Sequence, residues 1–222
     1  MNRPRPPDFT CELEGIIASA GFSSGHRFVV GHWDESPIGP FDDVMWARPD
    51  GTRLLLVARS EAAEFITAVY RFDTVDAMAL ECRMDGALLR VSAGDLRLTM
   101  QGGRPWRIPL SRLRSRAQVR PFEGLVARAL FGVRTWGVSP TGVSEWYRAD
   151  EYRPVVSADA CLGNQELGTV RPFHEPAGFG FSEPPRRPSM VTVRPLLHDP
   201  SGRLAEVAGD RHGGRFSSGS GG

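Results

Sequence analysis

Four carboxylates and one imidazole lie within a short stretch near the start of the chain, and such side chains can move protons. The stretch is Gly31–Val44, GHWDESPIGPFDDV, and its ionisable residues are His32, Asp34, Glu35, Asp42 and Asp43. They could form a general acid and base pair, but their spacing matches no metal motif, so no metal is expected. His32, Asp34 and Glu35 are therefore catalytic candidates. The alternative is that Asp34 and Glu35 cap the turn, that Asp42 and Asp43 face water, and that His32 is an ordinary strand histidine.

Prolines make the middle of this stretch stiff. Pro37 and Pro40 each fix φ and remove a backbone donor, and Gly39 between them can adopt a positive φ, which predicts a rigid turn over Ser36–Phe41. Strand-favouring residues precede and follow it. The turn is therefore expected at the rim of a sheet, where functional sites are common.

The same residues resemble a known family. SPIGPF followed by Asp42, Asp43 and a hydrophobic strand is similar to the S-P-x-G-P-[YF]-D-E-ϕ stretch near the start of some acetoacetate decarboxylase-like proteins. The resemblance implies an antiparallel β-cone around an apolar cavity. The family's second signature, an aromatic-Gly-ϕ-Pro-Lys run that carries the Schiff-base lysine apparatus, has no counterpart in this sequence.

The sequence contains no lysine, and all 27 basic residues are arginine. A Schiff base or a lysine general base needs an amine that can lose its proton, whereas the guanidinium group stays protonated. Lysine-dependent decarboxylase or aldolase chemistry is therefore excluded.

A second candidate site lies on a predicted hairpin rich in aromatic residues. Val133–Val138 and Val143–Ala149 flank the turn sequence Ser-Pro-Thr-Gly. Glu145 lies next to Trp146, and an apolar wall would raise the pKa of its carboxyl group. Glu145 is therefore a fourth catalytic candidate, with a sheet-surface glutamate as the alternative.

Ligand-binding candidates are aromatic, apolar or cationic side chains that could line a cavity. One or two arginines are expected to clamp a carboxylate at the mouth of that cavity. The ligand-binding candidates are Trp46, Met100, Trp136, Tyr147 and Arg134.

Composition argues against several classes of protein. The net charge of +1 provides no global field for nucleic acid or an anionic membrane, although Gln101–Arg120 carries arginines and no acidic residue. The three cysteines form no C-x-x-C motif, which argues against a zinc knuckle or a redox dithiol. No signal-peptide core or membrane-span-length apolar run is present. We expect a cytoplasmic protein without a cofactor, with a homodimer as an open alternative.

Hydrophobic periodicity predicts the elements. Pro49-Asp50-Gly51 predicts a hairpin over Val44–Arg59, and apolar spacing predicts a helix from Ser60 onward. Strict alternation from Met78 to Met100 predicts an antiparallel meander. A second helix is predicted over Gln118–Phe131.

These elements predict an α+β, mostly antiparallel β fold, closed into a barrel or cone with two packed helices. A single domain over 9–197 is expected between a loose N-terminus (1–8) and a disordered Gly/Ser-rich tail (198–222). The preferred function is binding of a small apolar or carboxylate-bearing ligand in an internal cavity. One alternative is a lysine-independent enzyme of the hydratase, isomerase or cyclase type. Another is a protein-interaction module that presents Trp136 and Trp146.

Overall fold

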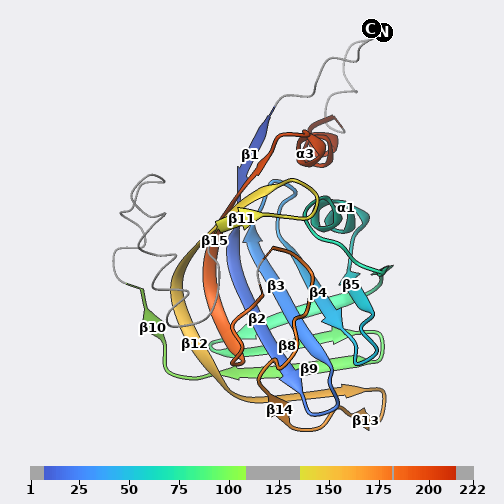
Figure 1. Cartoon of the computed structure of the whole chain (residues 1–222), viewed down its shortest axis with the longest axis vertical. Coiled ribbons are helices and arrows are strands. Elements are labelled where there is room, and N and C mark those ends of the chain that lie inside the picture. Colours follow the sequence, from blue (N-terminus) through green and yellow to red (C-terminus); the bar gives the residue numbers. More distant parts are fainter. Residues whose placement is uncertain (1–7, 109–135, 182, 214–222) are drawn as a thin grey trace, which may run out of the picture.

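The computed structural model describes residues 8–108, 136–181 and 183–213, with side chains up to residue 209. Within these ranges one large sheet forms the body of the molecule, and its main path runs β6-β5-β4-β3-β2-β15-β12-β9-β8-β7 (Figure 1). Neighbouring strands on this path are antiparallel except β5 and β6, which are parallel and are joined through helix α1. The predicted second helix at 118–131 lies outside the described residues.

The strands of the main path are β2 (Glu14–Phe22), β3 (Arg27–Glu35), β4 (Phe41–Ala47), β5 (Arg53–Val57), β6 (Thr74–Ala77), β7 (Leu80–Asp85), β8 (Leu88–Ala93), β9 (Leu96–Gly102), β12 (Ser144–Leu162) and β15 (Ser189–Asp199). Short strands pair beside them: β1 (Phe9–Glu12), β10 (Trp106–Arg107), β11 (Trp136–Val138), β13 (Gln165–Glu166) and β14 (Val170–Arg171). The helices are α1 (Ser60–Val69) and α3 (Arg203–Gly213).

Both faces of the central strands are buried, and each carries its own core. The helix-side core contains side chains from the strands, from α1 and from α3, for example Met45, Phe65 and Leu204. The meander-side core joins β2–β5 to β7–β9, for example through Val44 and Leu98. Figure 1 shows β8 and β9 crossing behind β2 and β3. Because alternate residues of a strand point to opposite faces, neighbouring residues in a strand belong to different cores, and every second residue belongs to the same one.

The sheet curls into a half-barrel and does not close, so the predicted closed barrel is wrong. In the described part of the chain, the ends of the path are β6 and β7, which follow one another in sequence but do not pair. One layer contains β2–β6, and the other contains β7–β9 and crosses it. The chain passes from the first layer to the second between β6 and β7. The space between the layers is filled by side chains such as Phe28, Leu89 and Met100. The mostly antiparallel α+β class is as predicted.

The locally encoded elements are also as predicted. Helix α1 begins at Ser60, the hairpin of β4 and β5 turns at Gly51 with φ of 87°, and β7–β9 form the meander. No helix within the described ranges is long and apolar enough to cross a membrane.

The C-terminal part differs from the predicted disordered tail. Strand β15 extends to Asp199, and α3 follows it. The Asp199 carboxylate accepts hydrogen bonds from the backbone N–H groups of Ser201, at 2.7 Å, and Leu204, at 2.9 Å. Leu204 is fully buried in the helix-side core. This cap and this anchor order a segment whose Gly-rich composition suggested a tail.

Candidate functional site

Glu145 is completely buried on β12, with 0% of its surface exposed. Its Cα partners are Leu197 on β15 and Gly137 on β11, so it lies between two neighbouring strands. Alternation along β12 places Glu145 on the same face as Val143, which belongs to the helix-side core. Trp146, the expected apolar wall, is on the opposite face of the strand.

Two tyrosines hold one oxygen of Glu145. The hydroxyl of Tyr70 donates to Oε2 over 2.6 Å, and the hydroxyl of Tyr147 donates to the same oxygen over 3.0 Å. The two phenolic oxygens also lie within hydrogen-bonding distance of each other. Because each hydroxyl has a single proton, the two phenols share two protons among these three contacts. Tyr70 is the C-cap residue of α1, and its backbone N–H donates to the carbonyl of Ile66. The packing of α1 therefore sets the position of one of the two donors.

Glycines make room for the rings around this cluster. The ring of Phe181 lies 6.2 Å from that of Tyr147, and a Cβ at Gly137 would collide with Phe181. A Cβ at Gly180 would lie 2.6 Å from the ring of Tyr70. The absence of a side chain at these two glycines therefore leaves room for the rings of Phe181 and Tyr70.

The second oxygen of Glu145, Oε1, is buried and has no hydrogen-bond partner among the residues that the structure describes. Burial raises the pKa of Glu145 to about 7, and this effect outweighs the hydrogen bonds from Tyr70 and Tyr147, which lower it. Burial also raises the pKa of both tyrosines well above their ordinary value, so they remain neutral donors. Glu145 can therefore give or take a proton near neutral pH while the phenols hold its other oxygen.

A second buried carboxyl group belongs to Asp43 on β4, which is 1% exposed. The indole N–H of Trp33 donates to Oδ1 over 2.9 Å, and Oδ2 has no partner within the described ranges. Burial is the main reason that the pKa of Asp43 rises to about 7. The charge of Asp43 also contributes to the raised pKa of Tyr147, so the two carboxyl groups act on the same phenol. The expectation that Asp43 faces water is wrong.

His32 and Asp42 form a separate, half-exposed pair. Nδ1 of His32 lies 2.6 Å from Oδ1 of Asp42, and Nε2 lies 4.0 Å from Oδ1 of Asp34. The hydrogen bond to Asp42 is the main cause of the raised pKa of His32. Because Asp42 and Asp43 are neighbours in one strand, this pair is on the opposite face from Asp43. Glu35 is exposed at the end of β3. The four catalytic candidates are therefore not one site.

The proline-containing turn is held rigidly, as its sequence suggests. Gly39 has φ of 76°, and its N–H donates to the carbonyl of Ser36 over 2.9 Å. Arg59, immediately before α1, donates to the carbonyl of Pro40 over 2.9 Å. Ile38 is fully buried beneath the turn. These contacts attach the turn to α1.

The ligand-binding candidates are also dispersed. Tyr147 is beside Glu145, whereas Trp46 and Met100 belong to the meander-side core, where the indole of Trp46 donates to His26 over 2.9 Å. Trp136 on β11 is 48% exposed. Arg134 lies outside the described residues. In the part of the chain that the structure describes, no group of three or more His, Cys, Asp or Glu side chains could hold a metal ion.

Sequence reasoning missed two members of the site. Tyr70 directly follows the predicted helix and is of a residue type that more often packs in a core than binds a ligand, and no local signal pairs it with Glu145. Asp43 could have been found, because it alternates with the apolar residues Phe41 and Met45 and must share their face.

No protein-family model matches the sequence, and no curated protein matches it. Two solved structures are similar over most of the chain. One is an acetoacetate decarboxylase from Legionella pneumophila, with a TM-score of 0.40, 9% identity and coverage of 89% of both chains. The other is described as structural studies of acetoacetate decarboxylase, with a TM-score of 0.42, 9% identity and coverage of 87% of both chains. Both structures carry the name of the family that the Ser-Pro-Ile-Gly-Pro stretch resembles.

Proposed function

We propose that this protein binds a small, mostly apolar molecule through the unpaired oxygen of Glu145. The observation that carries the proposal is the asymmetry of this carboxyl group: Oε2 is held by two tyrosines, whereas Oε1 is also buried and has no partner in the described part of the chain. The ligand would supply the missing hydrogen-bonding group.

The energy of an unpaired buried oxygen supports this assignment. Leaving a buried polar atom without a partner costs about 1–3 kcal/mol, and more when the group is charged. Such atoms are rare in native proteins and often mark a functional site or a bound water. A glutamate held by two phenols is already oriented, so a ligand would lose little free energy in ordering it.

The protonation state of Glu145 defines the ligand class. With its pKa raised to about 7, the group carries a proton in mildly acidic and neutral solution. A proton on Oε1 would be donated to a ligand oxygen, which favours a carbonyl or carboxylate group on an apolar body. The aromatic rings of Phe181 and Tyr147 would contact the apolar part.

Two variants at Glu145 and one control variant at another glutamate test the binding site. Glu145→Gln places an amide N–H₂ where Oε1 is and keeps a carbonyl oxygen for the two tyrosines, so it mimics the protonated acid. Glu145→Leu removes both functions. Glu166→Leu, at an exposed position on β13, is the matched control.

Ligands would be sought among short keto acids, fatty acids and aromatic ketones, by melting temperature and tryptophan emission. We expect the affinity of a ketone to fall above about pH 7 in the wild type, to be independent of pH in Glu145→Gln, and to be lost in Glu145→Leu. A ligand that binds Glu145→Leu as tightly as it binds the control would refute the proposal, as would a panel in which no compound binds.

A second candidate function is lysine-independent acid–base catalysis of the hydratase, isomerase or cyclase type. The pKa of Glu145, raised to about 7, favours it because a general acid or base works best when its pKa is near the working pH. Glu145→Gln separates the two functions. If Glu145 transfers a proton in the reaction, this variant will bind substrate and lose turnover by about 100-fold or more.

A further inference from the structure

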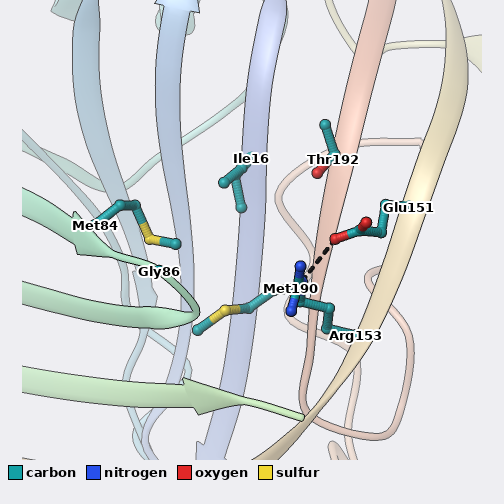
Figure 2. Close-up of a pocket in the computed structure, with 7 residues that line it drawn as sticks. All are labelled: Ile16, Met84, Gly86, Glu151, Arg153, Met190 and Thr192. Carbon is teal, nitrogen blue, oxygen red and sulfur yellow. Dashed lines mark hydrogen bonds and ion pairs between the residues drawn. The ribbon is translucent and has the colours of Figure 1, made fainter. Parts of the chain in front are cut away.

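A cavity of about 240 Å³ opens on the face of the sheet opposite Glu145. Its lining side chains come from β2, β7, β12 and β15, and Figure 2 shows them around the cavity. One part of its wall is apolar and consists of Ile16, Met84 and Met190. The other part is polar and consists of Glu151, Arg153 and Thr192.

A β-bulge in β12 explains why this cavity is separate from Glu145. The register of β12 on β15 shifts between Ala149 and Glu151. Without the shift, Glu151 and Arg153 would share a face with Glu145, because all three positions are odd. With it, Arg153 pairs with Met190, a residue of the meander-side core. The bulge therefore directs the side chains of the Glu151–Arg153 ion pair toward this cavity.

The polar part of the wall has unused hydrogen-bonding capacity. Nε of Arg153 donates to Oε1 of Glu151 over 2.6 Å, and one terminal nitrogen donates weakly to the carbonyl of Gly103 over 3.4 Å. A guanidinium group has five N–H donors, so most of them are not used by these two bonds. The hydroxyl of Thr192 has no hydrogen-bond partner among the described residues.

The charges beside the cavity favour an anion. Arg107 lies 3.8 Å from the carboxylate of Glu151, so two arginines surround one glutamate. The side chain of Arg153 is 30% exposed, which reduces the screening of its charge by water. Arginine also binds carboxylates through two parallel N–H groups.

We propose that this cavity is a binding site for a short-chain aliphatic carboxylate, with Arg153 and Thr192 on the head group and the two methionines on the chain. Methionine side chains adapt to irregular apolar ligands. A volume of about 240 Å³ is below the range of roughly 300–1,000 Å³ for drug-sized ligands, which favours a short chain. This site is independent of the one proposed at Glu145.

The test is a titration of the intact protein, labelled with ¹³C in the methionine methyl groups, with butanoate, hexanoate and octanoate. Met84 and Met190 report on this cavity, and Met45 in the helix-side core reports on the other face. We expect Met84 and Met190 to shift together and to saturate, with Met45 unchanged. Affinity should rise by about fourfold per added CH₂ until the cavity is filled.

Variants distinguish a carboxylate site from general apolar binding. Arg153→Met should weaken hexanoate binding by at least about tenfold and leave 1-hexanol binding unchanged. Glu151→Gln should strengthen hexanoate binding because it releases Arg153. Arg90→Met, at an exposed arginine on β8, is the control and should change neither.

Three results would overturn the proposal. One is an absence of shifts at Met84 and Met190, and another is shifts at Met45 alone. The third is an equal affinity of hexanoate for the wild type and for Arg153→Met.

Discussion

The hydroxyl of Tyr70 lies 2.6 Å from Oε2 of Glu145, although the two residues are 75 positions apart in the sequence. Tyr70 terminates α1, and Glu145 lies in the buried part of β12. The proton affinity of the glutamate therefore depends on how the helix packs on the sheet. Tyr147, from the strand of Glu145 itself, provides the second donor.

Removing either phenol should raise the pKa of Glu145 further. Both hydrogen bonds lower this pKa, and the bond from Tyr70, at 2.6 Å, is shorter than the bond from Tyr147, at 3.0 Å. We expect a larger rise in Tyr70→Phe than in Tyr147→Phe, with a loss of about 0.5–1.5 kcal/mol in the free energy of unfolding for each. Carboxyl ¹³C titration and urea unfolding measure the two effects. Equal pKa values in the wild type and both variants would show that the phenols do not contact the charged form.

The contribution of Glu145 and Asp43 to stability should fall as the pH rises through the acidic and neutral range. Glu145 and Asp43 have ordinary pKa values of 4.5 and 3.8, and both rise to about 7 in the folded protein. The folded state therefore binds more protons than the unfolded state between these limits. This stabilisation is fully present below the ordinary values and is lost above about pH 7.

Between its ordinary pKa and about pH 7, each of these two carboxyl groups should lower the free energy of unfolding by about 1.4 kcal/mol per pH unit. The raised pKa of His32 acts in the same direction, so the comparison must be made between variants. Urea unfolding from pH 4 to pH 8 should show a shallower slope in Glu145→Gln than in Glu166→Gln, the exposed control. Parallel curves would contradict the raised pKa of Glu145.

Gly31→Ala should disrupt the second carboxyl group. A Cβ at this position would collide with Oδ1 of Asp43 and with the indole nitrogen of Trp33. Because both contacts are buried, we expect a loss of at least about 1–3 kcal/mol and a change in near-ultraviolet circular dichroism. Gly209→Ala is the control, because a Cβ there would contact nothing within 4 Å. It should be neutral or stabilise α3 by up to about 1 kcal/mol.

Asp42→Asn should lower the pKa of His32. The bond between Nδ1 of His32 and Asp42, at 2.6 Å, is the main cause of its elevation. The asparagine keeps the shape and loses the charge. Imidazole proton NMR gives the titration midpoint directly. Asp34→Asn should have a smaller effect, because Asp34 lies 4.0 Å from the ring. An unchanged midpoint in Asp42→Asn would contradict the assignment.

Elements that depend on local sequence patterns could be predicted, but the full length of the longest strand could not. The hairpin at Gly51, helix α1 and the meander β7–β9 all follow from turn residues and periodicity. Strand β12 runs unbroken over Ser144–Leu162, whereas the hairpin arm predicted from the sequence ends at Ala149. Pro154 and the register shift after Ala149 break the alternation that would have extended the predicted arm.

The candidate site could be predicted only in part for a similar reason. Glu145 was identified from its aromatic neighbours, but Trp146 is on the wrong face to raise its pKa. Desolvation comes instead from the complete burial of Glu145, whose direct partners are the hydroxyl groups of Tyr70 and Tyr147. The contact between Tyr70, at the end of α1, and Glu145, on β12, forms only when the sheet curls. Hydrophobic periodicity along the sequence therefore cannot predict this contact.

A ¹³C NMR titration of the glutamate carboxyl groups, with Glu145→Gln to assign the signal, tests the proposed role of Glu145 most directly. We expect one signal with a midpoint near pH 7 that is missing from the variant. In the presence of a bound ketone the midpoint should rise, because the ligand accepts the proton on Oε1. A midpoint near the ordinary value of 4.5, unaffected by any ligand, would show a solvated carboxylate and remove Glu145 from the proposed function.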